Sequence, residues 1–150
     1  MALVPPPTEA GFLEFVRTVM GITVVVLPDN SPIIPVAYEA STQIVNQSIN
    51  CASPFMYMLA VYNLAASNLI NYTPDQPGQT YFADQRTLWN INSFSPGVVQ
   101  SAADVSTSAS LLVPEFMKDL TLANLQQLKD PWGRRYLAIA QDYGPLWGLT

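Results

Sequence analysis

Histidine is absent from this chain, cysteine occurs once, and charged residues make up only 11% of its 150 positions. Histidine is the usual general base at neutral pH and a common zinc ligand. Its absence excludes most of the known arrangements of acid–base catalytic residues and of zinc ligands. The eleven carboxylates are scattered singly, and no glycine-rich phosphate loop or Walker sequence is present. The sequence therefore predicts no catalytic residue, no cofactor and no metal site.

The single cysteine, Cys51, excludes an intramolecular disulfide. Since no histidine can activate it, we expect Cys51 to be a small buried apolar residue and not a nucleophile. Many Ser and Thr residues keep one alternative open, a small hydrolase or ligand-binding domain, in which a serine would need Lys118 or Lys129 as its base.

Positive charge is also scarce, with six Lys and Arg residues, a net charge of −5, and no basic residue between Arg17 and Arg86. A protein that grips nucleic acid by its phosphates needs clustered basic residues, so such a role is not expected. DNA could still pass beside an acidic or neutral wall without being bound. The N-terminal sequence lacks a basic segment followed by an apolar core, so we expect no secretory signal and a cytoplasmic site of assembly.

Apolar residues make up 49% of the chain, and the mean hydropathy is +0.19. The charged fraction is less than half of the ~25% usual for soluble domains. A monomer of this composition would show water a surface of neutral polar and apolar groups, which favours association. The composition fits a subunit covered by copies of itself or by partners; a monomer with a neutral surface is the alternative.

Hydrophobic periodicity predicts one mainly α-helical domain over residues 1–150. Its first seven residues, 1–7, are expected to form an extended arm. A first helix is expected from Glu9 to Met20, capped by Thr8 and stopped by Gly21. Its apolar stripe comprises Phe12, Phe15, Val16 and Val19. Residues 22–27 suggest a short strand or extended connector, and 28–32 a turn. A second helix is expected from Pro35 to about Ile49, with an apolar face of Val36, Ala37, Tyr38, Ala40, Ile44, Val45 and Ile49.

The segment from Pro54 to about Asn71 has no charge and is apolar nearly all the way round. A membrane span needs about 20 such residues, so a membrane-active protein using helix 54–71 is one interpretation. Four polar residues and the absence of basic flanks favour a central helix surrounded by other helices instead. Those polar residues, which are expected to mark contact with a neighbouring subunit, are Asn63, Ser67, Asn68 and Asn71.

The last third begins with a loop at 73–79 and a helix or turn at 80–90. Residues 98–113 predict a small β-hairpin with a turn near Ala103 and Asp104, although their small polar side chains would also suit a linker. Two helices follow, at 115–127 and 131–142. Asp130 caps the second and Gly144 ends it, leaving a tail at 145–150.

Several residues in this region are candidates for binding. Arg134 and Arg135, the one adjacent basic pair, either form a solvated helix face or make salt bridges to a neighbour. The aromatic residues Trp132, Tyr136 and Tyr143 are expected in the core, with an interface as the alternative. Beyond the helix stop lie Leu146, Trp147 and Leu149, which suit an anchor inserted into a partner's pocket or a tail folded back onto its own domain.

The order of these parts resembles the head–tail connector proteins, also called adaptor or neck proteins, of tailed bacteriophages. The likeness lies in a helical bundle, a hairpin of small residues, and a terminal helix with the pattern P-W-G-R-R-Y-x-x-I-A-x-x-Y-G. It covers residues 96–144 in pattern and the earlier residues in architecture alone.

The resemblance implies a structural, non-enzymatic virion protein that is assembled in the host cytoplasm. It would form a ring of about twelve copies in the phage neck, join the portal protein to a downstream neck or tail protein, and extend the DNA channel without binding a sequence. The portal-facing role falls on Tyr143, Leu146, Trp147 and Leu149. A tail-terminator or stopper ring of the same virion is the nearest alternative.

Overall fold

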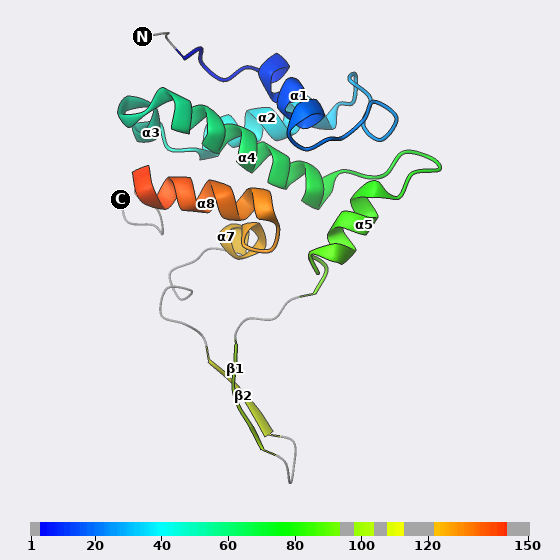
Figure 1. The fold of residues 1–150 in the computed structure, drawn as a ribbon, viewed down its shortest axis with the longest axis vertical. Coiled ribbons are helices and arrows are strands. Elements are labelled where there is room, and N and C mark those ends of the chain that lie inside the picture. The colour runs from blue at the N-terminus through cyan, green and yellow to red at the C-terminus, as the bar shows by residue number, and fades with distance from the viewer. Residues whose placement is uncertain (1–3, 94–97, 104–107, 113–121, 144–150) are drawn as a thin grey trace.

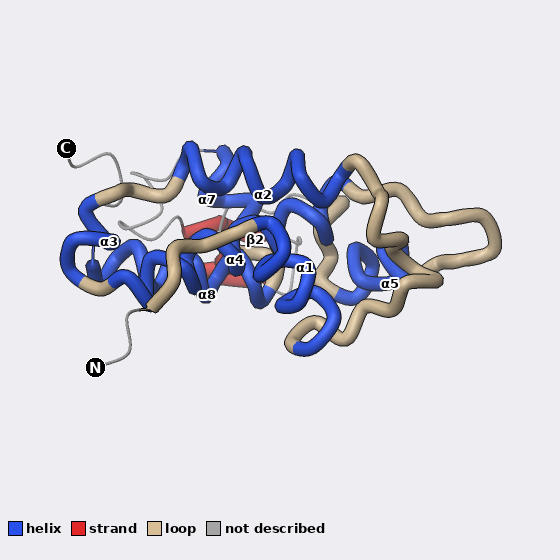
Figure 2. Tube along the Cα trace, turned by 90° about the horizontal axis from the view of Figure 1, so that it is seen from above, coloured by secondary structure: helices blue, strands red, loops and turns tan. Residues whose placement is uncertain are grey.

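A computed structural model describes residues 4–93, 98–103, 108–112 and 122–143. The long helix α4 (Pro54–Tyr72) lies at the centre of a helical bundle (Figures 1 and 2). The helices that pack on it are α1 (Glu9–Thr18), α2 (Ile33–Ile44), α3 (Ser48–Ala52), α5 (Tyr81–Leu88) and α8 (Pro131–Tyr143). A short helix, α7 (Leu122–Gln127), packs against α8. Seen from above in Figure 2, α2 and α8 lie on opposite sides of α4.

The sequence of α4 explains its central place. The Ser53 hydroxyl accepts a hydrogen bond from the Met56 amide at 3.4 Å, and Pro54 occupies the first turn, where its missing N–H costs nothing. Most of its residues from Tyr57 to Ile70 are buried, which a helix apolar on all sides requires. The predicted central helix is confirmed. Within the described ranges, we find no helix with the length and apolar character needed to cross a membrane.

Helix α1 begins as expected, because the Thr8 hydroxyl accepts from the Gly11 amide at 3.0 Å. Phe12 and Val16 are fully buried. The helix stops at Thr18, two residues earlier than predicted, so Val19 falls at the C-cap and is exposed. Gly21 follows with φ of +70°, a left-handed conformation that glycine adopts readily and that reverses the chain.

The segment 22–27 is a turn and not the expected strand or extended connector. The amides of Val26 and Leu27 both donate to the Thr23 carbonyl, at 3.1 and 3.0 Å. Ile22 and Leu27 are buried at its two ends, while Val24 and Val25 are exposed and Val26 is half-buried. The β-branched run therefore reflects two core anchors and not a paired strand.

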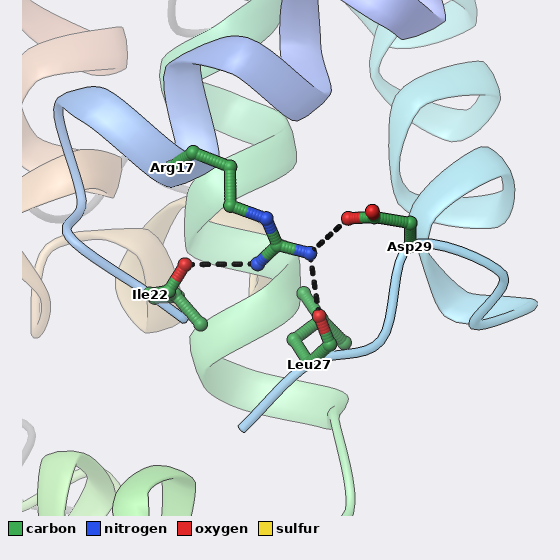
Figure 3. A network of polar contacts seen from close by, with 4 residues as sticks. All are labelled: Arg17, Ile22, Leu27 and Asp29. Atoms are coloured by element: carbon green, nitrogen blue, oxygen red, sulfur yellow. Dashed lines mark hydrogen bonds and ion pairs between the residues drawn. The ribbon is translucent and has the colours of Figure 1, made fainter. Parts of the chain in front are cut away.

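Arg17 holds this turn from the end of α1 (Figure 3). Its guanidinium donates to the carbonyls of Ile22 at 2.8 Å and Leu27 at 2.6 Å, and forms an ion pair with Asp29. A planar fork with several donors suits three acceptors on different parts of one loop. The turn predicted at 28–32 is present, closed by the Ser31 amide on the Pro28 carbonyl at 3.0 Å.

The second predicted helix is in fact two. Helix α2 starts at Ile33 and ends at Ile44, and the buried Val45 that follows is extended, with φ of −65° and ψ of 127°. The Asn46 side chain then accepts from the Ser48 amide at 2.8 Å, a local bond that competes with a continuous helix. On α3 only Ile49 reaches the core, so Cys51 is exposed, and the expectation that it would be buried is wrong.

The face of α2 was also assigned incorrectly in part. Ala37 and Tyr38 are buried as predicted, but they are joined by Ile34 and Ser41. By contrast, Val36, Ala40 and Ile44 are exposed. Because α2 is apolar on two sides, only one side can pack on α4.

The C-terminal elements return to α4. The Asp75 carboxylate caps α5 by accepting from the amides of Phe82 and Ala83, at 2.8 and 2.9 Å. The loop predicted at 73–79 is confirmed. Of the helix expected at 115–127, the structure describes α7 alone, since 113–121 lie outside the described residues. Helix α8 agrees with its predicted bounds to one residue.

Two strands, β1 (Val98–Ala103) and β2 (Ser108–Leu112), pair antiparallel, with Val98 opposite Leu112 and a shift of register between Val99 and Ser101. Figure 1 shows them projecting from the bundle. The packed elements of the bundle are all helices, so the helices define the fold class, which is mainly α as predicted. The complete hairpin over residues 98–113 stays a prediction. Its turn at Asp104 lies outside the described residues.

Candidate docking groove

The outer face of α2 forms one wall of a groove. Val36 is 61% exposed and Ile44 57% exposed, although both are large and apolar. Val36 and Ile44 are eight residues apart, and Ala40 lies four residues from each, so the three side chains form one stripe along the helix. The apolar residues of this wall are Ile33, Val36, Ala37, Ala40 and Ile44.

The other walls are polar but carry no formal charge. The end of α4 contributes Ser67, Asn68, Asn71 and Tyr72, and the end of α7 contributes Gln126 and Gln127. The groove has a volume of 340 Å³, near the lower end of the ~300–1,000 Å³ usual for binding pockets. Tyr72, which is 60% exposed, extends the apolar surface at the rim.

A directional chain of hydrogen bonds runs along the polar side of the groove. The Tyr72 hydroxyl donates to Gln126 Oε1 at 2.8 Å, and Gln126 Nε2 donates to Asn71 Oδ1 at 3.1 Å. Asn71 Nδ2 then donates to Asp130 Oδ2 at 3.2 Å, beside the Ser67 hydroxyl, which donates to the same oxygen at 2.7 Å. All of these hydrogen bonds are donated in the direction of the Asp130 carboxylate. The network joins α7 to α4 and so fixes this wall of the groove.

Asp130 is the buried acceptor at the end of this chain. Its side chain is fully buried, and its Oδ1 accepts the Gly133 amide at 2.8 Å, which caps α8 as predicted. Desolvation by burial raises the pKa of this carboxyl, and the hydrogen bonds from Gly133, Ser67 and Asn71 oppose the shift. The sequence predicted the cap but not the burial, which depends on partners about 60 residues away in the chain.

Family models, curated proteins and solved structures gave no match to this chain. What the protein does must therefore be argued from its own residues.

The motif that carries the resemblance is occupied by contacts within the chain. Trp132 packs edge-on against Phe15, with ring centroids 5.8 Å apart, and Tyr136 is buried. A Cβ at Gly133 would lie 2.7 Å from the Cα of Gln127 and closer still to its carbonyl oxygen, so only glycine lets α8 approach the end of α7. These residues have structural reasons to be where they are.

The two arginines of the motif differ. The Arg134 guanidinium lies over the Trp89 ring, 5.5 Å from its centroid, and donates to the carbonyls of Leu128 and Lys129. Arg134 thus has contacts within the chain, and its salt bridge to a neighbour stays a prediction. Arg135 is exposed, and its contact with an acidic partner stays a prediction.

The predicted tail anchor is described at its first residue alone. Tyr143, the last residue of α8, is exposed and so does not belong to the core with Trp132 and Tyr136 as expected. Leu146, Trp147 and Leu149 lie outside the described residues.

The polar residues of α4 were expected at a subunit interface, but most make hydrogen bonds inside the chain, although the Oδ1 atom of Asn63 is buried without a partner among the described residues. Asn63 and Ser67 are buried, with Asn63 Nδ2 donating to the Leu59 carbonyl at 2.7 Å. Asn71 serves the network around Asp130. Three of the four, Ser67, Asn68 and Asn71, also line the groove. The groove itself was missed, although its signal, a second apolar stripe on α2, is present in the sequence.

Proposed function

We propose that this chain is a structural subunit of a phage neck, a connector that assembles as a ring between the portal and the tail. The observation that carries the proposal is the outer face of α2, where Val36 and Ile44 remain exposed beside a groove without charge. Leaving such a contiguous apolar surface in water is unfavourable, and large exposed patches of this kind mark interaction sites.

The low charge supports the same proposal. With a net charge of −5 and six basic residues in 150, the chain suits a subunit flanked by copies and stacked between partners, past which DNA moves without being held. The resemblance in the terminal helix adds the portal as a partner. The residues of that motif make contacts within the chain, which explain their presence without a partner. The exposed face of α2 therefore supports the proposal more strongly than the motif does.

Within this proposal, the hairpin over residues 98–113 is an arm that projects from the helical bundle and is available to adjacent subunits. The portal-facing segment comprises Tyr143, Leu146, Trp147 and Leu149. A tail-terminator or stopper ring of the same virion would use the same apolar surface but would not bind the portal.

The experiment is to measure the mass of the purified protein alone and mixed with the portal of the same phage. Formation of a ring of about twelve copies on the portal is the expected result, and a protein shortened after Gly144 is expected to keep its helical spectrum and lose portal binding. If the full chain ignores the portal, the connector role is wrong, and a terminator or stopper ring becomes the better proposal.

A further inference from the structure

The groove between α2, α4 and α7 is suited to a chain segment more than to a small molecule. Sites for small molecules bury about 70–90% of their ligand, whereas this groove lies open along α2, with Val36, Ile44 and Tyr72 each more than half exposed. Eleven residues separate Ile33 from Ile44, which corresponds to about 16 Å of open apolar wall at ~1.5 Å per residue.

The chemistry of the groove restricts its occupant further. Its lining side chains carry no formal charge, so a charged occupant would lose hydration without gaining a partner. Its apolar wall favours large aliphatic and aromatic groups. The amides of Asn68 and Gln127 on the opposite wall offer acceptors and donors to an indole N–H or to a peptide backbone.

We propose that the groove binds the segment Leu146–Leu149 of a second copy of this chain. That segment, Leu-Trp-Gly-Leu, is uncharged and supplies one aromatic anchor between two leucines. Tryptophan is one of the residues most enriched among the energetic hot spots of protein interfaces, where it fills a well-packed pocket. The nearest charge on the segment's N-terminal side is Asp142, which lies on α8 outside the proposed contact.

A second copy supplies the segment because the chain's own segment falls short. The Gly133 backbone lies against Gln127, at the α7 wall of the groove. Tyr143 is ten residues further along α8, about 15 Å away at ~1.5 Å per residue. Trp147 is four residues beyond Tyr143, which span at most about 14 Å when extended, so the backbone would use its whole length on the straight path alone. It would also have to reverse direction and pass α4, which separates α8 from α2 (Figure 2).

The groove and the segment are different surfaces of the same chain. A contact between them is therefore heterologous, and repetition of it gives a closed ring or an open filament. This inference goes beyond the proposed function, since it concerns the free protein and requires no portal. The resemblance implies that the segment Leu146–Leu149 binds the portal. When no portal is present, the same segment would bind the groove of another copy.

Complementation between two variants tests the proposal by sedimentation velocity on full-length chains. Val36→Glu places a charge in the groove at an exposed position, and Trp147→Ala removes the anchor while leaving the groove intact. Leu88→Glu is the matched control, because Leu88 is 67% exposed on α5 and lines no part of the groove.

The wild-type protein and Leu88→Glu are expected to self-associate with rising concentration, and each of the other two variants to weaken that association at least tenfold. A mixture of Val36→Glu and Trp147→Ala should form a one-to-one complex, since one supplies the segment and the other the groove. Circular dichroism should show the same helix content in all four proteins.

Three results would overturn the proposal: wild-type protein that stays monomeric up to about 1 mM, which corresponds to negligible affinity; Trp147→Ala that associates like wild type; or a mixture that stays monomeric. Association sensitive to Val36→Glu alone would mean that another surface of a second copy fills the groove. Portal binding is measured separately, so either proposal can fail while the other stands.

Discussion

At the scale of single residues, Gly133 and Asp130 decide how the C-terminal helices meet the rest of the bundle. Gly133 allows α8 to touch the backbone of Gln127, and Asp130 joins the start of α8 to Ser67 and Asn71 on α4. Each residue acts through close backbone or polar contacts that few other side chains could make. Both therefore lead to sharp predictions.

Gly133→Ala is expected to lower the free energy of unfolding by about 1–3 kcal/mol or more, because the added methyl meets backbone that cannot move independently. Gly11→Ala is the matched control. Its methyl would meet the Tyr62 hydroxyl, which is a side-chain atom and not backbone, so a smaller loss is expected although that ring is buried. Urea denaturation of the two variants measures the difference. A Gly133→Ala protein as stable as Gly11→Ala would contradict the proposed contact.

The buried carboxyl of Asp130 predicts a dependence of stability on pH. Its pKa is raised above the ordinary value of 3.8 in the folded protein, chiefly by desolvation, so the folded state holds the proton to higher pH than the unfolded state. Its contribution to stability is fully present below 3.8 and declines as pH rises towards the raised value. The advantage of wild type over Asp130→Asn should therefore shrink with rising pH.

Urea titrations of both proteins at several pH values from about 4 to 7 measure this difference, in which the other carboxylates largely cancel. An advantage of wild type that grows with pH would mean that hydrogen bonds from Ser67, Asn71 and Gly133 outweigh the cost of burial, contrary to the direction found here.

At the scale of elements, loops are held by cationic side chains that reach carbonyls. Arg17 secures the turn after α1, Arg86 donates to the carbonyls of Ile70 and Thr73 at the end of α4, and Lys129 donates to those of Ile91 and Ser93 after α5. With Arg134, which donates to the carbonyls of Leu128 and Lys129, four of the chain's six basic residues bind backbone carbonyls of the same chain. Few remain for binding other molecules.

Arg17→Met is expected to lower the free energy of unfolding by about 1–3 kcal/mol, because two buried or half-buried carbonyls lose a charged donor. Asp29→Asn keeps both carbonyl bonds and removes only an exposed ion pair, so it should cost less than about 1 kcal/mol. Hydrogen exchange of the Val26 and Leu27 amides should also quicken in Arg17→Met. Equal losses in the two variants would show that the ion pair, not the carbonyl bonds, holds the turn.

At the scale of the whole molecule, scarcity of charge and an uncovered apolar face act together. Under the proposed function the exposed face of α2 binds protein partners, and the net charge of −5 disfavours binding to nucleic acid. The chain should therefore bind protein surfaces and leave DNA free to move.

Duplex DNA is expected to show no complex with this protein at about 50 mM salt, at protein concentrations where non-specific binders with dissociation constants of ~10⁻⁴–10⁻⁶ M would be saturated. The reason is the net charge of −5 with no described cluster of free basic residues. Gel retardation at low and raised salt checks it. A complex that weakens steeply with salt would reveal phosphate contacts and contradict the prediction.

Much of the helical order could be read from the sequence. Thr8, Ser53 and Asp130 predict the starts of α1, α4 and α8. A short polar side chain at the N-cap accepts a hydrogen bond from a free amide of the first turn. The central place of α4 followed from its lack of charge. These are local or compositional properties, and they do not depend on distant parts of the chain.

Only the tertiary structure decided which side of α2 is buried, because a helix with two apolar stripes gives periodicity no means of choosing between them. Packing on α4 took the stripe of Ile34 and Tyr38 and left Val36 and Ile44 to form the groove. The burial of Asp130 and the need for Gly133 are decided in the same way, by residues distant in sequence or by backbone approaching closely in space. Local chemistry determined where α1, α4 and α8 begin, and long-range packing determined which side of α2 stays exposed.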